Sequence, residues 1–218
     1  VVPSPMLLAA NFNTLSIFNL LVHHLINEEY EIFLVTHKCF TIRAKFPKGH
    51  KNEGVVADFV MARKEIGYKP GTREPIFVPG TLQDDLERRD FTVNAIAKDL
   101  DGTLIDPFNG QEDIQRKVLR TPLSTLQTFN DDPLRILRAI RFYITKGFHF
   151  SAEIDDIIKT YDYKNRMKVV SEERIREELY KCFKHDSLIT ISMLCDIPPL
   201  ARYIFDETKL WLKPTNEQ

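Results

Sequence analysis

Cysteine is scarce in this sequence of 218 residues, and long apolar runs are absent. The three cysteines, Cys39, Cys182 and Cys195, lie far apart and lack the spacing of a metal site, which predicts reduced thiols. No window has the length of apolar sequence that spans a bilayer, and no signal peptide is visible. These absences predict a protein of the cytoplasm or of an organellar matrix.

An excess of charge is also missing. Thirty Lys and Arg against 31 Asp and Glu give a net charge of −1, which argues against a uniformly basic nucleic-acid coat but allows a local basic face. With 43% hydrophobic and 28% charged residues, the composition is that of an ordinary globular protein. The length permits one or two domains with a buried core, and no internal repeat is present.

The first half of the chain has the pattern of a mixed α/β domain. Apolar residues at helical intervals predict a helix over residues 16–27, whereas residues 1–10 predict no regular element. Three runs rich in β-branched and aromatic residues predict strands at residues 31–35, 39–46 and 55–64. The last two are joined by a hairpin loop that contains Pro, Gly and Asn.

The chain then alternates between loops and short elements before it becomes helical. Residues 67–80, rich in Pro and Gly, predict a mobile loop with one short strand, and residues 81–98 have helical spacing. Residues 98–108 predict two short strands around an Asp-Gly turn. Helices are then predicted at residues 131–143, 151–159, 171–184 and 187–195. The expected fold is therefore α+β, with a mixed-sheet head over residues 1–123 and an all-helical neck over residues 124–218.

At the candidate site, charged residues recur at regular intervals among apolar residues. Asp90 and Asn94 would lie on the same face of one helix and could hydrogen-bond to a polar group such as a ribose hydroxyl. Arg88 or Arg89 could neutralise a phosphate. The alternative for this segment is a capped helix with a surface arginine pair.

A second set recurs at steps of three residues. One helical ridge would carry Asp132, Arg135 and Arg138. The aspartate accepts and the arginines donate hydrogen bonds, so together they complement the hydrogen-bonding edge of a base. The alternative is an i,i+3 salt bridge worth a few tenths of a kcal/mol. Asp58 lies in a predicted strand, where its carboxylate either faces solvent or is paired or metal-bound.

Four blocks in this order, RRDFTVNAI, DPFNGQEDI, DDPLRILRAIRF and SEERIREEL, resemble the class II tRNA nucleotidyltransferase (CCA-adding enzyme) and bacterial-type poly(A) polymerase family. The similarity covers roughly residues 11–185. The resemblance implies a nucleotidyltransferase-like head followed by a helical neck. It also implies template-independent addition of CMP or AMP to the 3′ end of tRNA, with Mg²⁺ as the cofactor and with ATP and CTP as substrates.

The resemblance assigns roles to matching positions. Asp90 and Asn94 would read the ribose, Arg89 would contact the triphosphate, and Asp132 with Arg135 would select the base, with Asp131 in place of the usual Glu. Asp106 and Gly110 would be fixed points of a flexible element between head and neck. Arg174 and Glu178 would belong to a helix that supports the helix of Asp132 and Arg135. Asp58 would be the third carboxylate of the metal site.

The sequence departs from the family at its start. The expected Gly-Gly-x-Val-Arg-Asp segment is missing, and Asn11 and Asn13 stand before the predicted helix where an Asp-x-Asp pair should hold the metals. Since asparagine contributes no net charge, we expect metal affinity and rate to collapse. The acidic residues at 28, 29 and 31 are a substitute cluster or simply a solvated helix end.

Three functions remain open at this point. The first is CCA addition by a chain that is catalytically impaired, with tRNA or another RNA 3′ end as partner. The second is a non-catalytic nucleotide- or RNA-binding member of the same family, or a poly(A) polymerase. The third is a structural partner of a complete nucleotidyltransferase. The chain ends where family members continue into further helical domains that hold tRNA, which indicates a fragment or a reduced RNA-binding surface.

Overall fold

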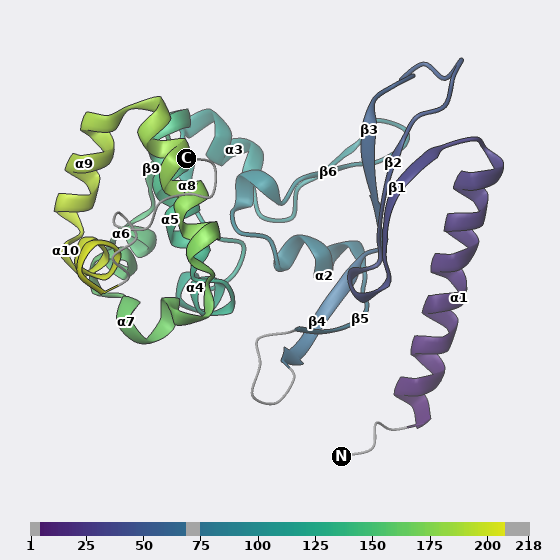
Figure 1. Ribbon diagram of the computed structural model, residues 1–218, viewed down its shortest axis with the longest axis horizontal. Coiled ribbons are helices and arrows are strands. Elements are labelled where there is room, and N and C mark those ends of the chain that lie inside the picture. Colours follow the sequence, from purple (N-terminus) through teal and green to yellow (C-terminus); the bar gives the residue numbers. More distant parts are fainter. Residues whose placement is uncertain (1–4, 69–74, 208–218) are drawn as a thin grey trace. The chain divides into compact units, whose positions relative to one another are not determined.

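The computed structural model describes residues 5–68 and 75–207, and the chain divides into two compact units, Val1–Asp85 and Leu86–Gln218. The α+β class is confirmed, since helices and small sheets both occur (Figure 1). The division between the units follows packing and lies well before residue 123, where the mixed-sheet head was expected to end. The assignment of residues 1–123 to a head and 124–218 to a neck stays a prediction.

The first unit combines a long helix with a three-stranded sheet and a separate hairpin. The sheet order is β1-β2-β3, and all described strand pairs of this unit are antiparallel. Its elements are α1 (Pro5–Asn27), β1 (Glu31–Thr36), η1 (His37–Cys39), β2 (Thr41–Lys45), β3 (Val56–Val60), β4 (Arg63–Tyr68), β5 (Pro75–Pro79) and the beginning of α2 (Leu82–Glu87).

A small core joins α1 to the sheet. Phe18 from α1 is fully buried against Phe40 and Ile42, which precede and belong to β2. The helix ends because Glu29 takes a left-handed conformation (φ 61°), after which the Tyr30 amide donates to the Leu25 carbonyl at 2.9 Å. The helix begins at Pro5, eleven residues earlier than residue 16, where the sequence pattern placed its start.

The predicted strand at residues 55–64 is two strands, because the chain leaves the sheet after Val60. The Met61 amide donates to the Phe40 carbonyl at 3.1 Å, and Arg63 then begins β4. The hairpin loop between β2 and β3 is confirmed. The short strand expected within residues 67–80 is β5, which pairs with β4.

The second unit is mostly helical. After α2, its described elements are η2 (Thr92–Asn94), β6 (Ala97–Lys98), β7 (Leu104–Ile105), α3 (Gly110–Arg116), β8 (Val118–Leu119), α4 (Thr125–Asp131), α5 (Leu134–Lys146), β9 (His149–Phe150), α6 (Ala152–Thr160), α7 (Tyr163–Arg166), η3 (Met167–Val169), α8 (Glu172–His185), α9 (Ser187–Asp196), α10 (Pro198–Arg202) and η4 (Tyr203–Glu207). The hairpin β6–β7 and the helices α5, α6, α8 and α9 confirm the predicted elements.

Helix α5 lies at the centre of this unit. Its residues Ile136, Leu137 and Ile140 are buried in the main hydrophobic core, and α8 packs along it (Figure 1). The amphipathic pattern explains this position, since the apolar face enters the core while the arginines point elsewhere. The helix ends at Gly147, which has a φ of 66°.

The helix expected over residues 81–98 is wrong for most of its length. Helix α2 ends at Glu87, the chain turns through residues 88–90, and Thr92–Asn94 forms the short 3₁₀ turn η2. Local helical spacing is outweighed here by burial, since Phe91 and Ala95 both enter the interior.

In the described ranges, no single helix is long and apolar enough to cross a membrane. The bent pair Ser187–Asp196 and Pro198–Asp206 reaches that threshold by length and composition alone.

Candidate functional site

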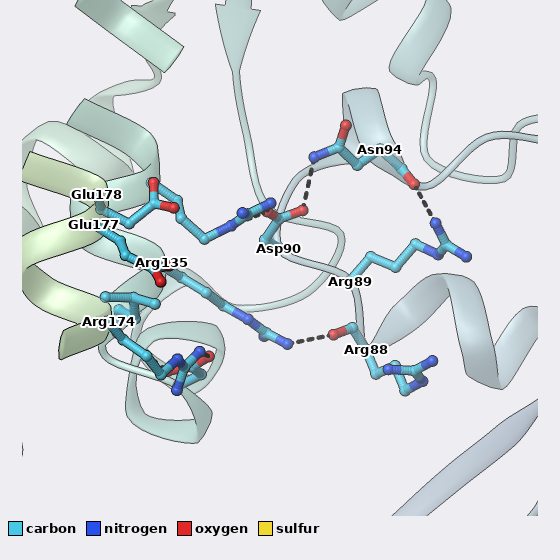
Figure 2. A pocket seen from close by; sticks show the side chains of 11 residues that line it. Arg88, Arg89, Asp90, Asn94, Arg135, Arg174, Glu177 and Glu178 are labelled. Carbon is cyan, nitrogen blue, oxygen red and sulfur yellow. Dashed lines mark hydrogen bonds and ion pairs between the residues drawn. The ribbon is translucent and has the colours of Figure 1, made fainter. Parts of the chain in front are cut away.

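A cavity of about 650 Å³ lies within the second unit (Figure 2). Its wall holds five arginines and four carboxylates, an unusually charged lining for a cavity of this size. The lining residues are Arg88, Arg89, Asp90, Asn94, Asp132, Leu134, Arg135, Arg138, Arg174, Glu177 and Glu178. The cavity contains seven residues predicted from the sequence, namely Arg88, Arg89, Asp90, Asn94, Asp132, Arg135 and Arg138.

Asp90 accepts four hydrogen bonds at the cavity wall. It is 8% exposed, and its Oδ1 accepts from the Phe91 amide and from Asn94 Nδ2, both at 2.9 Å. Its Oδ2 accepts from Nε and Nη2 of Arg138 at 2.8 and 2.5 Å. Asp90 and Asn94 therefore do lie together, but the 3₁₀ turn η2 brings them together rather than the face of an α-helix.

Arg135 donates hydrogen bonds to backbone carbonyls of two other segments. Its Nη2 donates to the Arg88 carbonyl at 2.6 Å (Figure 2). Its Nη1 donates to the Thr128 carbonyl at 3.3 Å. Arg135 and Arg138 both belong to α5, as expected. Two carbonyl bonds leave other guanidinium donors of Arg135 for a ligand, because the group carries five N–H bonds.

Asp132 does not lie on the same helix as Arg135, which corrects the expected ridge of three residues. It has an extended conformation between α4 and α5, because a proline, here Pro133, disfavours the helical region for the residue before it. Its Oδ1 accepts from the Leu134 amide at 3.2 Å and its Oδ2 accepts from Arg174 Nη2 at 2.9 Å. The carboxylate thus caps α5 and still lines the cavity.

The arginine pair before η2 forms the opposite wall. Arg89 Nη1 donates to the Asn94 carbonyl at 3.1 Å, which holds its guanidinium beside the turn. Arg88 contributes its carbonyl to Arg135 and its side chain to the lining (Figure 2). Planar guanidinium groups suit the oxygens of a phosphate, which they bind with two parallel hydrogen bonds.

Helix α8 supports α5, as the resemblance implied. Glu178 is buried and accepts from Arg141 Nε at 2.6 Å and from Lys181 Nζ at 2.9 Å. Burial raises the pKa of Glu178, but the bonds from Lys181 and Arg141 outweigh it and hold that pKa below its ordinary value.

Glu177 also lines the cavity and was not identified from the sequence. A signal for it existed, since it lies three residues after Arg174 and so shares a helix face with that arginine.

Asp106 and Gly110 do not line the cavity. Asp106 accepts from the amides of Gly110 and Gln111 at 2.7 and 2.8 Å, so that its carboxylate satisfies free donors at the start of α3. Those bonds lower the pKa of Asp106 below its ordinary value, although burial acts in the opposite direction. Gly110 is required by a close approach, because a Cβ atom there would lie 2.2 Å from the Thr92 carbonyl oxygen.

The residues predicted to bind metal belong to the first unit. Asp58 pairs with Arg43, whose Nε and Nη2 donate to its two oxygens at 2.7 and 2.9 Å. These bonds hold the pKa of Asp58 below its ordinary value. Asn11 and Asn13 lie inside α1 rather than before the helix, and their side chains are outside the described part of the chain.

The described side chains do not by themselves form a magnesium site. Both oxygens of Asp58 are occupied by a guanidinium, and no group of three His, Cys, Asp or Glu side chains that could hold a metal occurs among the described residues. The assignment of a metal to Asp58, Asn11 and Asn13 therefore stays a prediction.

Known proteins share stretches of this sequence and the arrangement of its fold. The model of the poly A polymerase head domain matches residues 19–120. The CCA-adding enzyme of Lactobacillus helveticus (strain DPC 4571) is 39% identical over 120 residues, which cover 55% of this chain and 30% of that protein. The tRNA nucleotidyltransferase cca2 of Schizosaccharomyces pombe (strain 972 / ATCC 24843) is 42% identical over 132 residues, which cover 58% of this chain and 27% of that protein.

Solved structures agree with these matches. The Bacillus stearothermophilus CCA-adding enzyme in complex with CTP superposes with a TM-score of 0.65 at 30% identity, covering 78% of this chain and 39% of that one. The Thermotoga maritima CCA-adding enzyme complexed with tRNA superposes with a TM-score of 0.67 at 25% identity, covering 86% and 41%.

The chain is thus similar, in sequence and in fold, to CCA-adding enzymes and to the head domain of poly A polymerases. It spans about a third of the length of the curated relatives it matches.

Proposed function

We propose that this chain carries the nucleotide-selecting part of a template-independent nucleotidyltransferase that adds CMP or AMP to the 3′ end of tRNA. One observation carries the proposal. Asp90 and Asn94 line one cavity of about 650 Å³ together with Asp132 and Arg135, which come from a separate segment of the chain. A volume of this order is that of a small-molecule site.

The charges of the wall match the parts of a nucleoside triphosphate. The arginines supply donors in a planar arrangement that suits phosphate oxygens, which supports Arg88 and Arg89 as triphosphate ligands. Asn94 is fixed by Asp90 at 2.9 Å, and together these two side chains offer donors and acceptors for a ribose hydroxyl.

A base would be read by side chains instead of a nucleic-acid template. Asp132 is an acceptor and Arg135 is a donor, so the pair offers the complement of one edge of cytosine or adenine. The contact of Asp132 with Arg174 at 2.9 Å supports this role, because it holds the carboxylate in one orientation. Arg138 supports the site by holding Asp90.

The resemblance to the family is the reason to include a magnesium ion in the proposal. Magnesium, when bound, would stabilise the charge of the leaving pyrophosphate. Asp58 is the one candidate ligand whose side chain is described, and Arg43 donates a hydrogen bond to each of its oxygens.

The test compares nucleotide binding with transfer. The chain is titrated with CTP and with ATP by isothermal calorimetry, then incubated with Mg²⁺, labelled nucleotide and a tRNA that lacks its CCA end. We expect both nucleotides to bind, and we expect Asp132→Asn and Arg135→Met to weaken binding roughly tenfold or more. Glu112→Gln, an exposed carboxylate outside the cavity, is the control and should bind as the wild type does. Failure of the wild type to bind either nucleotide would contradict the proposal.

A second candidate function is nucleotide binding without transfer. The two bonds from Arg43 to Asp58 favour it, since they satisfy the carboxylate that the family uses at its metal site. This candidate predicts CTP and ATP binding that changes little with Mg²⁺, and no incorporation. Incorporation of AMP alone into RNA would instead indicate a poly(A) polymerase. Asn11→Asp combined with Asn13→Asp separates the readings further, because a gain of transfer would identify these positions as the degenerate metal motif.

A further inference from the structure

A buried polar network lies directly behind the turn that carries Asp90 and Asn94. Thr92 stands midway between these two cavity residues, yet it is fully buried and does not line the cavity. Its Oγ1 donates to Asp113 Oδ2 at 2.6 Å, and Asp113 lies on α3, 21 residues away in the sequence. The turn therefore has one side toward the cavity and one side bonded to α3.

The carboxylate of Asp113 is a buried charge with a full set of partners. It is 4% exposed, and Arg120 donates from Nε to Oδ1 at 3.0 Å and from Nη2 to Oδ2 at 2.8 Å. Arg120 Nη2 also donates to the Phe108 carbonyl at 2.9 Å. A buried carboxylate that is paired and hydrogen-bonded in this way holds its neighbours in one arrangement.

The backbone of Thr92 is held as well. Its amide donates to the Arg120 carbonyl at 2.9 Å, and its carbonyl accepts from the Ala95 amide at 2.9 Å. Gly110 closes the remaining side, because even a methyl group there would collide with the Thr92 carbonyl. Thr92 is thus fixed by its side chain, its amide and its carbonyl at once.

Such support is needed because η2 is weak by itself. It has three residues, and its own bonds are those from the amides of Asn94 and Ala95 to the carbonyls of Phe91 and Thr92. Short 3₁₀ turns have poorer hydrogen-bond geometry than α-helices and are stable mainly through their surroundings.

We infer that Thr92 and Asp113 are positioning residues of the cavity: their hydrogen bond fixes η2, and through it the placement of Asp90 and Asn94. The effect on a nucleotide rests on the proposed function. Since neither residue touches the cavity, their contribution reaches a ligand only through the geometry of the turn. Loss of the bond should weaken CTP and ATP to the same extent, because the turn is separate from the base-reading pair Asp132 and Arg135.

The test uses the nearly isosteric variant Thr92→Val, which removes the hydroxyl and keeps the volume. Thr125→Val is the matched control, because Thr125 is also fully buried and its Oγ1 shares a hydrogen bond with Thr121 Oγ1 at 2.9 Å, away from the cavity. Thr92→Ser restores the hydroxyl. Dissociation constants for CTP and ATP are measured by calorimetry, and urea midpoints are measured for all variants.

We expect Thr92→Val to weaken both nucleotides roughly tenfold, while Thr125→Val stays within about twofold of the wild type and Thr92→Ser recovers most of the affinity. Both valine variants should lower the urea midpoint by a similar amount. Equal weakening by Thr125→Val, or no weakening by Thr92→Val, would overturn the inference.

A second measurement needs no nucleotide and so separates this inference from the proposed function. Amide hydrogen exchange of the free protein should be about tenfold faster at Asn94 and Ala95 in Thr92→Val than in Thr125→Val, while exchange in α8 should be similar in the two variants. Unchanged exchange at these two amides overturns the inference whether or not the wild type binds CTP. If Thr92→Val fails to fold, Asp113→Asn weakens the same bond from the other side and is judged by the same exchange measurement.

Discussion

Arg138 donates two hydrogen bonds to a single carboxylate oxygen of Asp90, from Nε at 2.8 Å and from Nη2 at 2.5 Å. The two residues are 48 positions apart, one on α5 and the other in the turn before η2. Because the Asp90 side chain is only 9% exposed, its charge needs this partner in the folded state. The contact joins the centre of the helical core to the wall of the cavity.

Removal of Arg138 should therefore destabilise the second unit strongly. We expect Arg138→Met to lower the free energy of unfolding by about 3 kcal/mol, because it leaves the Asp90 carboxylate buried without its counter-charge. Urea unfolding followed by circular dichroism measures the change. Arg116→Met is the control, since Arg116 pairs with Glu112 on the surface of α3 and should cost less than about 1 kcal/mol. Equal losses in the two variants would show that the contact between Arg138 and Asp90 stabilises the protein no more than a surface ion pair does.

Neighbouring positions at the start of α3 should differ strongly in how much stability a substitution costs. Gly110→Ala brings a Cβ within 2.2 Å of the Thr92 carbonyl oxygen, so backbone must move, and we expect a loss of about 1–3 kcal/mol. Asn109 already has a left-handed conformation (φ 59°), so Asn109→Gly should be nearly neutral. Thermal unfolding of both variants tests the pair. A neutral Gly110→Ala would mean that α3 can shift away from η2 at little cost.

Acid should remove the contribution of Glu178 in a defined range. Its folded pKa lies below the ordinary value of 4.5, so the ionised form is favoured by folding. The stabilisation is therefore fully present above about pH 4.5 and is lost as the pH falls through the folded pKa. We expect the difference in unfolding free energy between wild type and Glu178→Gln to be constant from neutral pH to about pH 5 and to shrink below that. A difference that persists in strong acid would contradict the assignment.

The Arg43–Asp58 pair on the sheet should behave differently, because both side chains are substantially exposed. Loss of Arg43 in Arg43→Met should raise the pKa of Asp58 toward its ordinary value, as followed by carbon NMR of the carboxyl group during an acid titration. The free energy of unfolding at neutral pH should change by less than about 1 kcal/mol. Lys45→Met, which removes the neighbouring pair with Glu31, serves as the control and should leave the Asp58 pKa unchanged. A pKa of Asp58 that is the same in all three proteins would show that the two hydrogen bonds are not held in solution.

The sequence by itself determined the α+β class and many of the residues that line the cavity. Helix α5 was predictable because its apolar residues recur with the helical period, and Arg135 and Arg138 follow from the same spacing. The hairpin around residues 101–102 was equally local, since an Asp-Gly pair favours that turn. In each case a single short segment contains all the information that its conformation requires.

Only the tertiary structure decided how these segments meet. The pattern of residues 81–98 is helical, but burial of Phe91 and the bond from Thr92 to Asp113 turn the chain into η2 instead. In the same way Asp132 does not lie on the predicted ridge but accepts a hydrogen bond from Arg174, which is 42 residues away in the sequence. Contacts of this range are invisible to local periodicity, because their free energy depends on which distant groups the folded chain brings within hydrogen-bonding distance and removes from water.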